Sequence, residues 1–258
     1  EAAKAEGYFT PEAYQLFKEL EFKNMLKYFD NVDTQSQNED LKKHFQVLED
    51  ESTCKKVLST FCKNHKEIGL IILTDNKKFQ GLAICGSKEE IYLYYQAPTG
   101  MVENQQLSLF DSFEQKENTV IADLVKEISA KVKVATVDIK KQYAFLQTEN
   151  TKNYFDAVLA AYLLNPLKND YDGEAIALEH LGLTIPGFKE VFGKRTVAEA
   201  YKETPETVAE YFMYQAYVAI AAKEVLESKL KEAGMLSLMN EIEMPLSYVL
   251  YDMEKEGV

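Results

Sequence analysis

Cysteine and histidine are scarce in this chain of 258 residues, which has only three of each. The cysteines form no CxxC pair and are widely spaced: Cys54, Cys62 and Cys85. The histidines are isolated in the same way: His44, His65 and His180. Such spacing excludes a disulfide framework and lacks the clustered ligands that a zinc site needs. We therefore expect reduced thiols in a cytoplasmic protein, with the histidines structural or facing solvent.

The sequence also has no long apolar run. Its first residues, EAAKAEGYFT, lack the apolar core of a signal peptide, and runs such as DAVLAAYLLNP are shorter than the ~20 residues that span a bilayer. An excess of basic residues is absent too, because the net charge is −13. We expect a soluble protein with no membrane contact. If the chain touches DNA, we expect it to do so weakly or through another domain.

Motifs that bind nucleotides or activate a serine are missing: the chain has no GxGxxG, P-loop or GxSxG sequence. What is present is an ordinary globular composition, with 46% hydrophobic and 28% charged residues. The chain divides into three zones. Residues 1–48 form a charged lead-in, in which a helix over 10–29 is followed by a polar linker over 30–43.

The middle zone mixes strands with helices. Strands are predicted over 67–75, 78–86, 89–96 and 131–138, and helices over 52–64, 118–130, 139–148 and 154–165. The stretch GLTIPGFKEVFGK, residues 182–194, is predicted to be a loop. This order indicates an α/β fold, with a mixed sheet flanked by helices. The third zone is helical, with one long helix over 204–234 followed by an amphipathic segment.

Gln215 is a polar residue on the apolar face of that long helix. The face repeats with a 4-3-4-3-4 spacing through Val208, Phe212, Gln215, Ala219, Ala222 and Leu226. A buried amide without a hydrogen-bond partner destabilises a fold. Gln215 is therefore either a satisfied core glutamine or a replacement for a residue that had another role.

The end of the chain carries the most specific pattern. EIEMPLSYVLYDMEKEGV resembles the opening of the polymerase module of the bacterial DNA polymerase I family, the family A polymerases. The matching residues are Glu243, Pro245, Leu246, Val249, Leu250, Met253, Glu254, Gly257 and Val258. FDAVLAAYLLNP, residues 155–166, resembles a helix of that family's central domain. TPEAYQLFKELEFKNMLKYFD resembles the segment that leaves the family's 5′-nuclease.

The resemblance covers nearly the whole chain and implies a fragment of such a polymerase. Residues 1–48 would be the helical linker from the 5′-nuclease region, and 49–233 a 3′–5′ exonuclease-like domain with an RNase H-like fold. Residues 234–258 would be the first helix of the polymerase domain. The family's palm, with its Mg²⁺, would lie beyond Val258, so no cofactor is expected in this fragment.

The family's proofreading site holds two metal ions with four carboxylates from three motifs, and its aspartate and glutamate positions fall here on altered residues. The Asp-x-Glu motif falls on Leu73 and Asp75. The second motif places Gln142 where an aspartate is expected, with Asp138 at its asparagine position. The third, Tyr-x-x-x-Asp, falls on Tyr211 and Gln215.

Two divalent ions roughly 3.5–4 Å apart need several anionic oxygen ligands. The resemblance therefore implies no catalytic residue and no metal ligand, and Leu73, Asp75, Gln142, Tyr211 and Gln215 would be vestigial positions. Gln215 would then bond to Gln142 or Tyr211 where a cation would have been.

The predicted function is a catalytically inactive exonuclease-like domain, a platform for the polymerase module in DNA replication and repair. Its partners would be that module, by intramolecular contact, and DNA through the rest of the polymerase. Its location would be the bacterial cytoplasm, near the nucleoid. One alternative is a residual metal-dependent 3′–5′ exonuclease that uses Asp75, Asp138 and Glu89 or Glu90. Another is an unrelated acidic α/β scaffold that binds a protein.

Overall fold

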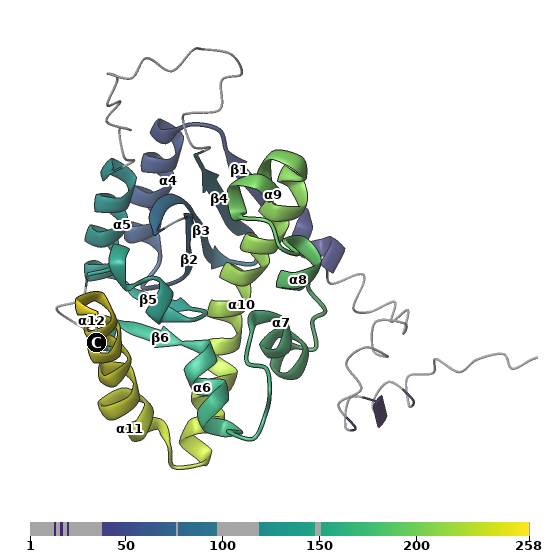
Figure 1. Cartoon of the computed structure of the whole chain (residues 1–258), viewed down its shortest axis with the longest axis vertical. Coiled ribbons are helices and arrows are strands. Elements are labelled where there is room, and N and C mark those ends of the chain that lie inside the picture. Colours follow the sequence, from purple (N-terminus) through teal and green to yellow (C-terminus); the bar gives the residue numbers. More distant parts are fainter. Residues whose placement is uncertain are drawn as a thin grey trace, which may run out of the picture.

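A six-stranded mixed sheet forms the centre of the computed structural model (Figure 1). The structure describes Ala13, Leu16, Phe17 and Leu20 and residues 38–75, 77–96, 119–147 and 151–257. The strand order is β1-β4-β3-β2-β5-β6, in which β2, β3 and β4 are antiparallel and the other neighbours are parallel. The strands are β1 (Phe45–Leu48), β2 (Glu67–Asp75), β3 (Lys78–Ser87), β4 (Glu90–Tyr95), β5 (Lys133–Thr136) and β6 (Tyr154–Asp156).

Helices cover both faces of the sheet. The α-helices are α4 (Glu51–Asn64), α5 (Thr119–Lys131), α6 (Ala157–Leu164), α7 (Gly173–Ile176), α8 (Phe188–Val191), α9 (Val197–Glu203), α10 (Pro205–Glu232), α11 (Leu236–Leu238) and α12 (Met244–Glu256). Three short 3₁₀ helices are η1 (Ile139–Lys141), η2 (Tyr143–Phe145) and η3 (Thr151–Asn153). Two short π-helices are η4 (Ala177–Leu181) and η5 (Met239–Glu243). In the described part of the chain, no helix combines the length and apolar content of a membrane span.

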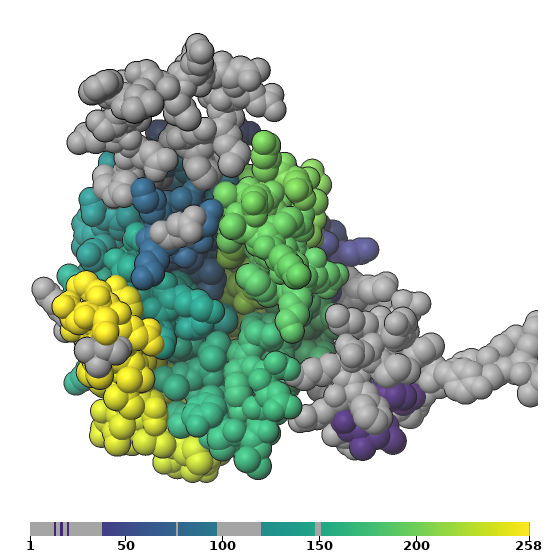
Figure 2. Space-filling model, in the orientation of Figure 1, coloured from purple at the N-terminus to yellow at the C-terminus, as the bar shows by residue number. Residues whose placement is uncertain are grey.

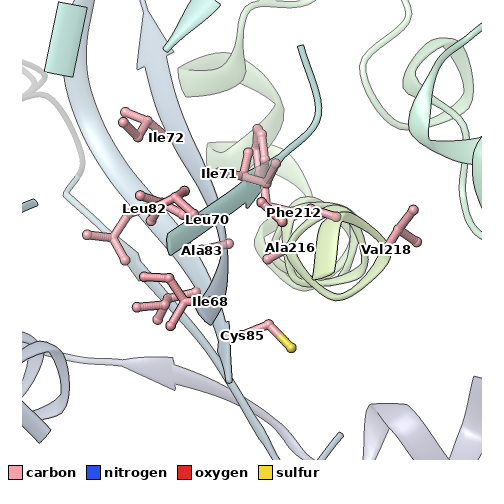
Figure 3. Packing of buried hydrophobic residues seen from close by; sticks show 14 of the residues in the cluster. Ile68, Leu70, Ile71, Ile72, Leu82, Ala83, Cys85, Phe212, Ala216 and Val218 are labelled. Carbon is pink, nitrogen blue, oxygen red and sulfur yellow. The ribbon is translucent and has the colours of Figure 1, made fainter. Parts of the chain in front are cut away.

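The long helix α10 lies against the sheet because a glycine leaves room for it. A Cβ atom on Gly69 of β2 would lie only 2.0 Å from the backbone oxygen of Ala216. Figure 3 shows Phe212 and Ala216 facing the sheet, with Ile71 beside Phe212. Since side chains alternate along a strand, Ile68 and Ile72 face the opposite layer, which contains α4 and α5. All these residues are buried, so the sheet has an apolar core on both faces.

The long elements match the sequence predictions. The apolar run 67–75 is β2, the turn at 86–89 joins β3 to β4, and α10 has Pro205 in its first turn. Gly234, which follows α10, has a φ of +71°, the left-handed conformation that commonly ends a helix. The α/β prediction of a mixed sheet flanked by helices is confirmed.

Four local predictions are wrong. Strands β1 and β6 were not expected. Within the helix predicted over 139–148, residues 139–141 and 143–145 form the 3₁₀ turns η1 and η2 instead. Part of the predicted linker, residues 38–42, is helical, and its Leu41 is buried. The predicted loop 182–194 contains the short helix α8. The helix expected over 10–29 lies almost entirely outside the described residues, and the division at 48 and 233 stays a prediction.

Candidate functional site

The end of β2 holds the first two predicted positions. Leu73 is 1% exposed, and Asp75 is half-buried as the last residue of the strand. By alternation both lie on the face of the sheet that α10 covers. Asp75 lies near Tyr95 of β4, since its charge adds to the effect of burial in raising the pKa of that phenol to about 12. Tyr95 in turn stacks on Tyr201 of α9, with ring centroids 3.9 Å apart.

Gln142 joins two strands through its side-chain amide. Its Oε1 accepts a hydrogen bond of 2.9 Å from the backbone N–H of Ile72 in β2. Its Nε2 donates to the Thr136 hydroxyl at the end of β5 and, at 3.0 Å, to the carbonyl of Val137. The ladder between β2 and β5 ends at Gly69 and Ala135, so the amide continues the connection beyond the last pair. Gln142 is 3% exposed, and its amide is well satisfied.

Asp156 fixes the backbone that presents Gln142. Its carboxylate accepts N–H bonds from Asp138 at 3.1 Å, Ile139 at 3.0 Å and Val158 at 2.9 Å. Burial nevertheless raises the pKa of Asp156 to about 6. Asp138 has a φ of +58°, a left-handed conformation that is uncommon outside glycine, and it leads directly into η1.

The sequence prediction missed Asp156. A signal was available, because an aspartate before the apolar run AVLAAYLL is a typical helix N-cap. Its bond to Val158 is the N-cap bond, while the two bonds across to Asp138 and Ile139 depend on the tertiary fold.

Tyr211 and Gln215 lie one turn apart on α10. Tyr211 contacts Phe192 and Phe188 around α8, with centroid distances of 5.1 Å and 6.3 Å. Burial raises the pKa of Tyr211, and the charges of Glu174 and Asp172 add to the shift.

The amide of Gln215 lies against the start of α7. A Cβ atom on Gly173 would be 1.8 Å from its Oε1, and the residue is 4% exposed. Gln215 is thus buried, as its place on the apolar face predicts. Among the described residues no hydrogen bond joins it to Gln142 or Tyr211, so the predicted partners are wrong.

The fold brings the elements of the three motifs together, because α10 packs on β2 and Gln142 bonds to β2 beside Leu73. Within the described part of the chain, no hydrogen bond or ion pair links any two of the five predicted positions. Nor do three His, Cys, Asp or Glu side chains there form a group that could hold a metal ion. Leucine and two glutamines at these positions do not fit a pair of divalent cations.

The acids of the alternative, a residual exonuclease, do not all lie close together. In the sheet register, Asp75 lies opposite Lys78 at the start of β3. Glu90 lies opposite Ser87 at the other end of that strand. Strand β3 has 10 residues, so about 30 Å separates these ends. Glu89 and Glu90 therefore cannot share a metal with Asp75.

The fold has clear counterparts among solved structures. The structure described as "Brucella melitensis NrnC bound to pGG" matches with a TM-score of 0.54 and 13% identity, over 83% of this chain and 93% of that one. The catalytic core of RRP6 from Trypanosoma brucei matches with a TM-score of 0.54 and 10% identity, over 79% and 51%. The chain has the α/β fold of the RNase H-like exonucleases.

Sequence comparison points to one kind of protein. DNA polymerase I of Bacillus subtilis (strain 168) is 35% identical over 105 residues, which are 40% of this chain and 12% of that protein. DNA polymerase I of Streptococcus pneumoniae (strain ATCC BAA-255 / R6) is 30% identical over 157 residues, 59% of this chain and 17% of that protein. The chain is similar to bacterial DNA polymerase I, which confirms the resemblance.

A polymerase structure shares the fold as well. The "POL domain of Pol1 from M. smegmatis complex with DNA primer-template and dNTP" matches with a TM-score of 0.54 and 15% identity, over 81% of this chain and 31% of that one. No protein-family profile matches the chain. The chain spans less than a fifth of the length of these curated relatives, 12% and 17%.

Proposed function

We propose that the chain is a catalytically inactive 3′–5′ exonuclease-like domain of a DNA polymerase I, a platform for the polymerase module in replication and repair. The observation that supports this most directly is Gln142. Its amide occupies the position expected for a metal-binding aspartate and is bonded instead to Ile72 of β2 and Thr136 of β5. It carries no charge, and its oxygen is already used by Ile72.

Charge supports the same proposal. Two divalent cations at close range repel each other and need several carboxylates. Leu73 offers no ligand atom, and the amides of Gln142 and Gln215 offer only neutral oxygens. Asp75 alone supplies one negative charge, which is too little for a two-metal hydrolysis.

An exposed apolar stripe on α12 and the turn before it fits the role of a platform. Its five residues are between 43% and 55% exposed: Ile242, Leu246, Val249, Leu250 and Met253. They recur at helical spacing, so they share one side of the helix. The stripe lies in the C-terminal segment, the yellow band on the surface in Figure 2. The polymerase module that the relatives' name implies is the proposed occupant of this stripe.

A nuclease assay tests the proposal. The chain is incubated with 5′-labelled single-stranded DNA and Mg²⁺ or Mn²⁺, and shortening from the 3′ end is followed on a gel. We expect none, and we expect no shift of the melting temperature with Mn²⁺. The matched control is Asp75→Asn, which removes the one carboxylate left at the four positions where the resemblance implies metal-binding acids. Shortening by the parent chain that Asp75→Asn abolishes would overturn the proposal, whereas shortening by both indicates a contaminating nuclease.

A further inference from the structure

The 3₁₀ segment that carries Gln142 also contacts α12. Figure 1 shows α12 beside the β5–β6 edge of the sheet. In the chain, η1 and η2 follow β5, and η1 contacts α12. The residue after Gln142, Tyr143, is 1% exposed and is the centre of this contact. One short stretch therefore touches the sheet at Gln142 and the last helix at Tyr143.

Tyr143 holds α12 through its hydroxyl and its ring. The Ser247 hydroxyl donates to the Met244 carbonyl at 2.7 Å, so it accepts the Tyr143 O–H, also at 2.7 Å. The Tyr143 ring packs against Tyr248 and Tyr251, with centroid distances of 5.4 Å and 5.5 Å. Such aromatic contacts are directional and set the rotation of a helix as well as its distance.

An ion pair adds a second, outer contact. The Nζ atom of Lys140 in η1 lies 2.8 Å from Oε1 of Glu254 in α12. Both side chains are substantially exposed, so the pair contributes little to stability.

We propose that Gln142 is a positioning residue for α12. By fixing η1 and η2 to β2 and β5, its amide sets the place of Tyr143, and Tyr143 sets the orientation of α12 and of its exposed stripe. The significance of that stripe rests on the proposed function, but the coupling itself does not. An aspartate at this position would have no N–H donor for the Val137 carbonyl and could not make the same connection.

Hydrogen exchange tests this coupling with a matched pair of variants. Gln142→Met and Gln215→Met each replace a buried glutamine by an apolar side chain of similar volume. In Gln142→Met we expect the amides of Ser247–Tyr251 to exchange about tenfold faster, since buried hydrogen bonds are lost. Gln215 contacts α7, whereas Gln142 directly precedes Tyr143 in the chain. In Gln215→Met we therefore expect the amides of α12 to exchange at the same rate as in the parent chain. Equal effects of the two variants on α12 would overturn the proposal.

A double variant separates positioning from a general loss of stability. Tyr143→Phe removes only the hydroxyl, and we expect it to accelerate α12 exchange by a smaller factor. If Gln142 acts through Tyr143, the double variant Gln142→Met/Tyr143→Phe exchanges little faster than Gln142→Met alone. If the acceleration in the double variant equals the product of the accelerations in the two single variants, the coupling is contradicted. The nuclease assay on the same samples reports separately on the proposed function.

Discussion

The two glutamines at the proposed former ligand positions differ in how the fold accommodates them. Both are nearly inaccessible, Gln142 at 3% and Gln215 at 4% exposure. Gln142 is held by hydrogen bonds to β2 and to the end of β5, whereas Gln215 fits into the space that Gly173 leaves open. The fold thus holds one amide by specific, directional hydrogen bonds and the other by steric fit. The first should tolerate change far less than the second.

The largest expected effect comes from restoring an aspartate at the bonded position. Gln142→Asp places a buried carboxylate beside the Val137 carbonyl and removes the donor that satisfied it. We expect a loss of about 4 kcal/mol in the free energy of unfolding at neutral pH, typical of an uncompensated buried charge. Urea unfolding followed by circular dichroism measures it.

The matched control for this variant is Gln215→Asp, which introduces the same charge on α10. We expect it to destabilise the protein less, because it breaks no hydrogen bond to the strands. If both variants lost the same stability, the contrast between the two positions would be wrong.

A smaller effect, dependent on pH, is expected at Asp156, which supports the backbone around Gln142. Its folded pKa of about 6 lies above the ordinary value of 3.8, so the folded state binds the proton more tightly than the unfolded chain does. The stabilising contribution is full below pH ~4 and is lost as the pH rises through 6, by up to about 3 kcal/mol.

Asp156→Asn removes this titration. Unfolding of the parent and of Asp156→Asn, measured from pH 4 to pH 7, should show the parent losing stability relative to the variant as the pH rises. A difference that stays constant over this range would show that Asp156 does not titrate there.

The smallest effect is expected at the sterically packed position. Gly173→Ala brings a methyl group against the Gln215 amide, and we expect a loss of about 1–2 kcal/mol, typical of overpacking. Gln215→Ser removes the obstructing atoms, so the double variant should be more stable than Gly173→Ala alone. Thermal unfolding of the three variants checks this. A double variant as unstable as the sum of both changes would place the strain elsewhere.

The long elements were predictable from sequence because local patterns determine them. The apolar run of β2 and the start and stop residues of α10 define these elements without reference to neighbours. The edge strands β1 and β6 were not predictable, since they have only 4 and 3 residues and exist through pairing with β4 and β5. The sequence over 139–148 has helical composition, yet the left-handed Asp138 and the bonds of Gln142 hold residues 139–145 in 3₁₀ turns.

The motif spacing is compatible with the burial of Gln142 and Gln215. It does not predict which residues contact their side chains. Ile72 precedes Gln142 by 70 residues, and Gly173 lies on a separate short helix. Only the folded chain brings these groups together. The same limit explains why Asp156 was missed as a support for η1, although its helix-capping role follows from local sequence.

Gly69 sets the distance between α10 and β2, and it carries no side chain that could take part in a reaction. The close approach of α10 to β2 depends on a missing side chain at Gly69, opposite Ala216. A lineage could therefore exchange carboxylates for amides and leucine at the motif positions while the helix kept its distance from the strand. Close packing of a helix on a strand at a glycine needs no metal ligand, so this contact can persist with or without carboxylates nearby.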